Sequence, residues 1–158
     1  MVSAFQLLGR TYSDGAGRVI PGLGLLDVDT AAGSPRLVGE VVTRTREGEL
    51  LTGFENHGGR TLLGSEVEPL GTVVRGNGNN GEDATEGARH GSLLGTYLHG
   101  PVLARNPALA DLLLGHVLAR RGLPQDAPPP APDDRAAALH QARLRAVLGR
   151  RTHHGRLR

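Results

Sequence analysis

The sequence predicts a mixed α/β domain, and three observations lead to this fold class. Short β-rich runs alternate with turn residues between residues 37 and 98, and helix signals occur at both ends of the chain. The 158 residues, 38% of them hydrophobic, are enough for one modest core. The 24 glycines and 10 prolines follow no collagen-like repeat and indicate many tight turns.

The elements of this domain are predicted in order along the chain. Residues 4–8 predict a short helix that stops near Gly9. Residues 37–43 and 50–54 are β-rich runs separated by an Arg-Glu-Gly-Glu segment, which indicates a hairpin. Residues 70–75 and 93–98 predict two further strands.

Two helices are expected in the last third of the chain. Asn106 is a candidate N-cap with Pro107 at the first helical position, and Gly122 is a candidate C′ residue. The apolar stripe of this helix consists of Leu109, Leu112, Leu113 and Val117. The expected organisation ends with a proline-rich linker over 124–132, a helix over 133–149 and a basic, disordered tail over 150–158. The apolar stripe of the second helix consists of Leu139, Leu144, Val147 and Leu148.

Charge is unevenly distributed. All 18 cationic residues are arginine; residues 135–158 hold seven of them and no acid, while the first 134 residues hold 11 against 16 Asp and Glu. An acidic globular part argues against a broad nucleic-acid surface.

The chain has no apolar run long enough to cross a bilayer, no recognisable secretory signal, and no cysteine for disulfides or Cys-based zinc sites, so we expect a cytoplasmic protein without a membrane span.

His99 is the first candidate for chemistry. It follows the predicted strand over 93–98, so it is expected at the carboxyl end of that strand, where open α/β sheets bind ligands. A histidine there can take a proton from a nucleophile and return it to a leaving group. The alternative is a histidine that merely caps the strand.

Glu55 and His57 form a rival acid and base pair, since residues two apart on a strand share a face. The alternative, which we prefer for His57, is that both hold the turn at 56–59 to neighbouring backbone.

The Gly76–Gly81 segment fits the dinucleotide pattern G-x-G-x-x-G, but Glu82, Asp83 and Glu86 would repel a pyrophosphate and no apolar helix follows. A glycine-rich surface loop is therefore expected.

Seven segments, taken in order, resemble the cobyric acid synthase-like class I glutamine amidotransferases, and within that group the GatD-type subunits of lipid II isoglutaminyl synthase. They lie at residues 6–12, 22–27, 36–39, 53–57, 76–80, 95–100 and 106–111. The resemblance implies a class I glutamine amidotransferase-like, flavodoxin-like sheet whose N-terminal half is missing, with residues 1–123 as the C-terminal part of the domain. It also implies glutamine as substrate and a MurT-like Mur-ligase partner in a heterodimer that amidates the D-glutamate of a peptidoglycan precursor. ATP and Mg belong to that partner, and no cofactor is expected in this chain.

The same resemblance assigns the site residues. His99 matches the catalytic general acid and base, Arg36 matches the arginine that holds the glutamine carboxylate, and Gln6 matches the Gln of the nucleophile elbow. Counting back from Gln6 puts the nucleophilic cysteine at Val2, where the attacking sulfur is absent. Ser3 lies one position away and would be misaligned.

The resemblance also implies about half a sheet before the elbow, and its absence here suggests a truncated or frame-shifted gene product. Without the thiol, this chain is expected to be an inactive copy that releases no ammonia from glutamine on its own. Three alternatives stay open. They are a non-catalytic pseudo-amidotransferase that docks on a synthetase, a cobyrinate-type amidotransferase of cobalamin synthesis, and a basic-tail module for acidic polymers.

Overall fold

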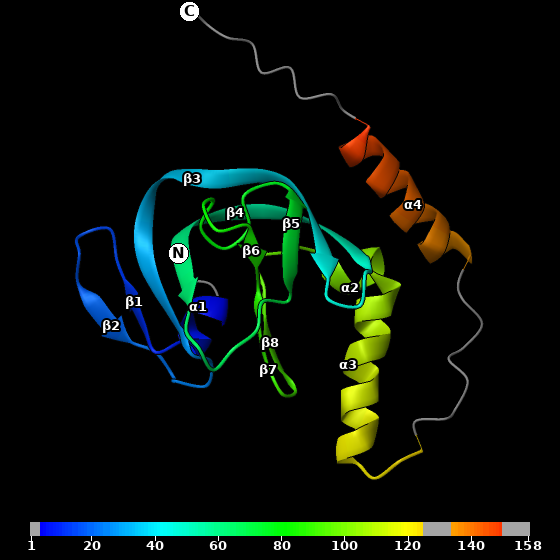
Figure 1. Ribbon diagram of the computed structural model, residues 1–158, viewed down its shortest axis with the longest axis horizontal. Coiled ribbons are helices and arrows are strands. Elements are labelled where there is room, and N and C mark those ends of the chain that lie inside the picture. Colours follow the sequence, from blue (N-terminus) through cyan, green and yellow to red (C-terminus); the bar gives the residue numbers. More distant parts are fainter. Residues whose placement is uncertain (1–3, 125–133, 150–158) are drawn as a thin grey trace, which may run out of the picture.

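The computed structural model describes residues 4–124 and 134–149 (Figure 1). Val2, Ser3, most of the predicted linker and the predicted tail lie outside these residues. Within the described part the elements are, in order, α1 (Ala4–Leu8), β1 (Thr11–Ser13), β2 (Val19–Pro21), β3 (Val28–Thr45), β4 (Leu50–Leu63), β5 (Gly71–Arg75), β6 (Thr85–Glu86), β7 (Ala88–His90), β8 (Leu93–Gly95), α2 (Val102–Arg105), α3 (Pro107–Arg120) and α4 (Asp134–Leu148).

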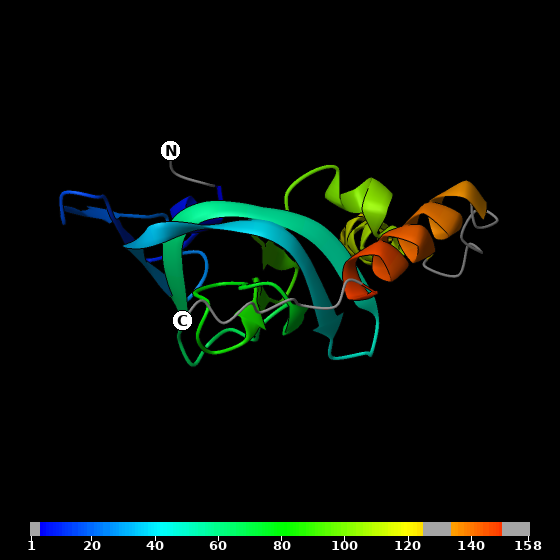
Figure 2. The same ribbon diagram turned by 90° about the horizontal axis from the view of Figure 1, so that it is seen from above.

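A long curved hairpin of β3 and β4 forms the frame of the molecule (Figures 1 and 2). Its turn is the predicted one, where Gly48 has a φ of 95° and donates from its N–H to the Thr45 carbonyl at 3.0 Å. Both strands are much longer than predicted, and their register shifts between Ala32 and Leu37. This bulge contains Arg36.

The mixed α/β class is confirmed, and the main sheet has the order β2-β1-β3-β5-β6 with β4 on β3. Its strand pairs are antiparallel except for β1 with β3, which is parallel. A separate two-stranded sheet pairs β7 with β8. One prediction needs correction: the strand expected over 93–98 ends at Gly95, because its pairing with β7 stops there.

Three hydrophobic clusters fill the two sides of the hairpin. The first surrounds α1 and contains Phe5, Leu26, Val28, Val67, Ala88 and Tyr97. The second joins the inner face of the hairpin to α3 and contains Val41, Leu51, Leu70, Leu98 and Leu109. Val42 points to the opposite face from Val41 and forms the third cluster with Leu144 and Val147 of α4.

Helix α3 begins at the predicted Pro107 but is not capped as predicted. The Asn106 side chain makes no cap hydrogen bond. Its amide instead accepts from the Thr52 N–H at 2.7 Å and donates to the Thr52 and Val102 carbonyls at 2.9 and 2.7 Å. Asn106 therefore ties the start of α3 to the middle of β4.

The loop after β5 is also different from the expectation. It is not a plain surface loop, because Asn79 and Asn80 are buried. Asn79 hydrogen-bonds both the N–H and the carbonyl of Gly87, at 2.8 and 3.0 Å, and Asn80 accepts from the Glu82 and Asp83 N–H groups. Gly76, Gly78 and Gly81 all have positive φ, so the glycine pattern serves this self-bonded turn.

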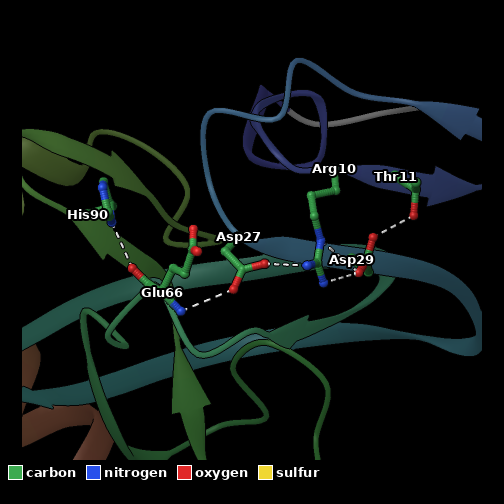
Figure 3. A network of polar contacts seen from close by, with 6 residues as sticks. All are labelled: Arg10, Thr11, Asp27, Asp29, Glu66 and His90. Atoms are coloured by element: carbon green, nitrogen blue, oxygen red, sulfur yellow. Dashed lines mark hydrogen bonds and ion pairs between the residues drawn. The ribbon is translucent and has the colours of Figure 1, made fainter.

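A polar network holds β1 to the start of β3 (Figure 3). Arg10 pairs with Asp27 at 2.6 Å and with Asp29 at 2.5 Å, and Thr11 donates to Asp29 at 2.6 Å. The Thr11 hydrogen bond, together with Arg10, lowers the pKa of Asp29. Each of these contacts links neighbouring elements, so we interpret the network as structural.

Candidate functional site

His99 is held at the middle of β4 rather than at the end of a strand. Its N–H donates to the Phe54 carbonyl at 2.9 Å in an isolated antiparallel bridge, and its side chain is exposed. Leu98 fits beneath the bridge because residue 53 is glycine: a Cβ there would lie 2.7 Å from a Leu98 methyl carbon. His99 therefore reaches the surface beside Phe54.

Arg36 is attached to the same stretch of β4. From the bulge in β3 its Nε donates to Asn56 Oδ1 at 3.1 Å, and its Nη2 donates to Asn56 Oδ1 and to the Asn56 carbonyl, both at 2.8 Å. Phe54 and Asn56 are two apart on a strand and share a face. The structure thus anchors His99 and Arg36 to residues two apart on one strand, although they are 63 positions apart in sequence.

Gln6 and Arg36 both line a pocket of about 250 Å³. The pocket is lined by Gln6, Tyr12, Ser13, Asp14, Gly15, Ala32, Gly33, Arg36, Gly58 and Gly59. It therefore lies between α1, the β1–β2 turn and the bulge of the hairpin. His99 is not among the described residues that line it.

The predicted nucleophile position precedes α1, which begins at Ala4. Val2 and the neighbouring Ser3 lie outside the described residues, so their distance from His99 stays untested. Among the predicted site residues, the structure brings Gln6 and Arg36 to one pocket and His99 and Arg36 to one stretch of β4.

Glu55 and His57 are buried and do not form a surface acid and base pair. Glu55 accepts from the Asn77 N–H, the Asn77 side-chain amide and the Gly78 N–H at 2.9, 2.7 and 2.9 Å. His57 Nδ1 lies 2.9 Å from the Gly59 carbonyl, and burial lowers the pKa of His57. A neutral His57 with its proton on Nδ1 satisfies this contact. The turn predicted over 56–59 is wrong, because these residues form part of β4.

Tyr97 is a buried residue that the sequence reasoning missed. Its hydroxyl lies 2.7 Å from Thr61 Oγ1, which lies 2.8 Å from Thr30 Oγ1. Its ring stacks on His57 with a centroid distance of 3.6 Å. The available signal was its place two residues before His99 in a chain with only two tyrosines.

Glu86 was also missed as a buried group. Its Oε1 accepts from Thr96 Oγ1 at 2.7 Å and from the Tyr97 N–H at 2.9 Å. Complete burial raises the pKa of Glu86 to about 7. It therefore points inward, against the expectation that it would present charge on the loop.

The part of the chain that the structure describes contains no group of three His, Asp or Glu side chains placed to hold a metal ion. None of its helices has the length and apolar character that a membrane crossing requires.

Comparison with known proteins gives one family match and several relatives. A profile described as the CobB/CobQ-like glutamine amidotransferase domain matches residues 3–107. The GatD subunit of lipid II isoglutaminyl synthase (glutamine-hydrolyzing) from Staphylococcus aureus (strain N315) is 43% identical over 120 residues, which cover 76% of this chain and 49% of that protein. The corresponding subunit of Streptococcus pneumoniae (strain ATCC BAA-255 / R6) is 41% identical over 132 residues, 82% of this chain and 50% of that protein.

A cobyric acid synthase from Pelotomaculum thermopropionicum (strain DSM 13744 / JCM 10971 / SI) is 36% identical over 141 residues, 77% of this chain and 26% of that protein. The chain thus spans about half the length of the two GatD relatives and about a quarter of this synthase.

Proposed function

Because the chain belongs to the CobB/CobQ-like glutamine amidotransferase family, we propose that it forms the glutamine-binding part of the ammonia-supplying subunit of a lipid II isoglutaminyl synthase. The observation that carries the proposal is the attachment of Arg36 and His99 to residues two apart on β4, with Gln6 and Arg36 at one pocket. Because Asn56 occupies Nε and Nη2 of Arg36, the Nη1 group is the part of the guanidinium that we propose donates to the α-carboxylate of glutamine.

The chemistry of such a subunit defines the roles we propose. A thiolate attacks the amide carbon of glutamine, and His99 protonates the departing nitrogen so that ammonia leaves and a thioester remains. Water, deprotonated by the same imidazole, then cleaves the thioester to glutamate and restores the thiol. Ammonia passes to a MurT-like ligase partner, which uses ATP and Mg to amidate the D-glutamate of the precursor.

The chain contains no cysteine, and Val2 occupies the expected position of the nucleophile. We therefore propose that residues 1–158 bind glutamine without hydrolysing it. This absence also favours a second candidate, a non-catalytic subunit that docks on a synthetase fed by free ammonia. Co-purification with a Mur-ligase-like protein, together with full amidation from ammonium salt alone, would support that second role.

The nucleophile assignment is tested by adding the missing thiol. Val2→Cys is expected to give ammonia release from glutamine, and Val2→Cys combined with His99→Ala is expected to lose it. Ser3→Cys is the matched control, since the same thiol one position away is misaligned with the imidazole. Equal ammonia release by Val2→Cys and Ser3→Cys, or release that survives His99→Ala, would contradict the proposed roles.

The partner and the acceptor are part of the same proposal. The relatives include cobyric acid synthases as well as GatD subunits, and in both kinds of system the acceptor is expected on the synthetase side. Pull-down of the purified chain with a MurT-like ligase and with a cobyrinate-type synthetase separates the two. Binding to the cobyrinate-type synthetase and not to the MurT-like ligase would contradict the lipid II role.

A further inference from the structure

We infer that Tyr97 is a positioning residue of the proposed glutamine site, holding α1 and His99 in one fixed arrangement. The inference rests on the proposed function, which gives α1 the nucleophile elbow and His99 the proton transfer. Tyr97 does not itself line the pocket described above. Its contacts connect the elements that carry the site residues.

The Tyr97 hydroxyl joins α1 to the hairpin. It lies 2.7 Å from Thr61 Oγ1 of β4 and also makes a side-chain hydrogen bond with Gln6 of α1. Burial raises the pKa of the phenol, so the hydroxyl keeps its proton and remains able to donate. The aromatic ring adds an edge-on contact with Phe5 of α1, at a centroid distance of 5.1 Å.

Gly59 shows how closely these groups approach one another. A Cβ at residue 59 would lie 2.2 Å from Gln6 Nε2, 2.7 Å from the Thr30 methyl carbon and 2.8 Å from the Tyr97 hydroxyl. No side chain fits there without moving the cluster. The hydroxyl group thus sits where α1, β3 and β4 converge.

The main chain of Tyr97 leads directly to His99 through residues that are each held. Glu86 Oε1 accepts from the Tyr97 N–H, and the Leu98 N–H donates to Thr96 Oγ1 at 3.0 Å. The His99 N–H donates to Phe54. We therefore expect a shift of Tyr97 to move the main chain that carries His99, and a misplacement of about 1 Å can cost an enzyme about 100-fold in rate.

Tyr97→Phe is the test, because it keeps both ring contacts and removes only the hydroxyl. The readouts are the His99 imidazole resonances in ¹H–¹³C NMR spectra, assigned with His99→Ala, and the affinity for L-glutamine by calorimetry. We expect the His99 resonances to shift and broaden, and the affinity to fall about ten-fold, as the loss of about one hydrogen bond implies.

Thr11→Val is the matched control, since it removes a partly buried hydroxyl that donates to Asp29 outside this cluster. It should leave the His99 resonances and the glutamine affinity unchanged while lowering the melting temperature. Circular dichroism establishes that each variant is folded. If Tyr97→Phe does not fold, Thr61→Val removes the partner hydroxyl and takes its place in the same comparison.

The inference is wrong if the folded variant has His99 resonances that coincide with those of the parent chain. This readout does not require glutamine to bind. Failure of the proposed function would look different: the parent chain would bind no glutamine, whereas the effect of Tyr97→Phe on His99 would persist.

Discussion

Glu86 shows how one buried side chain can give the fold a pH dependence. Its carboxyl group is fully buried, and its Oε2 makes no hydrogen bond within the part of the chain that the structure describes. Burial without a second partner favours the neutral acid, which is why the pKa is raised to about 7. The hydrogen bonds that Glu86 accepts from Thr96 and Tyr97 favour the carboxylate, so they oppose the effect of burial without cancelling it.

The sign of the resulting pH dependence follows from the two ionisation states. In the unfolded chain Glu86 loses its proton near pH 4.5, whereas in the native state it keeps the proton until about pH 7. The native state is thus favoured fully below about pH 4.5, and this stabilisation, ~3 kcal/mol, is lost as the pH rises through about 7.

Glu86→Gln removes this ionisation and keeps an acceptor oxygen. We expect the difference in unfolding free energy between the parent chain and Glu86→Gln to change by ~3 kcal/mol between about pH 5 and about pH 8, measured by urea denaturation. Glu82→Gln, on the exposed part of the loop, is the control and should show no such change. Parallel pH profiles for the parent and Glu86→Gln would disprove the argument.

Helix α4 illustrates what a sequence pattern does and does not determine at the scale of an element. The predicted stripe held four residues, but only Leu144 and Val147 are buried, against Val42. Leu139 remains 48% exposed, because the cluster with Val42 includes only Leu144 and Val147, in the second half of α4. One polar contact joins α4 to α2: His140 Nδ1 lies 2.7 Å from the Arg105 carbonyl oxygen.

Leu144→Ala is therefore expected to loosen α4 from the sheet and to lower the free energy of unfolding by about 2–4 kcal/mol. The loss would be at the lower end if the helix detaches. Leu139→Ala is the matched control and should cost well under about 1 kcal/mol. Urea denaturation gives the two values, and limited proteolysis within α4 shows whether the helix has detached. Equal costs for the two variants would mean that the third cluster does not hold α4.

At the scale of the whole molecule, local signals in the sequence predicted α1, the β3–β4 turn and α3. They did not predict the contacts that build the site, because these join distant residues. Asn106 resembles a helix cap by sequence, yet its amide bonds Thr52, 54 positions away. Likewise, His99 is held by its main-chain bridge to Phe54, and the Tyr97 N–H is held by the Glu86 carboxyl group. Motif order predicted which residues belong to the proposed site, whereas only the fold showed what holds them.

Because the pocket joins α1, the β1–β2 turn and the hairpin, glutamine bound there should stabilise the whole domain. A ligand at 100 times its dissociation constant adds about 2.7 kcal/mol to the free energy of unfolding, which for a chain of this size raises the melting temperature by about 5–10 °C. We expect this shift with L-glutamine and not with D-glutamine. Thermal denaturation followed by circular dichroism measures it.

Arg36→Lys should remove most of the shift, since a lysine ammonium lacks the planar fork that bonds Asn56 with one edge while a further N–H group donates to the glutamine carboxylate. Arg46→Lys is the matched control, because Arg46 is an exposed arginine whose ion pair with Glu68 lies outside the pocket. A shift that is the same in Arg36→Lys and in the parent chain would place the glutamine carboxylate elsewhere. The pocket between α1 and the bulge would then have to be assigned to another ligand.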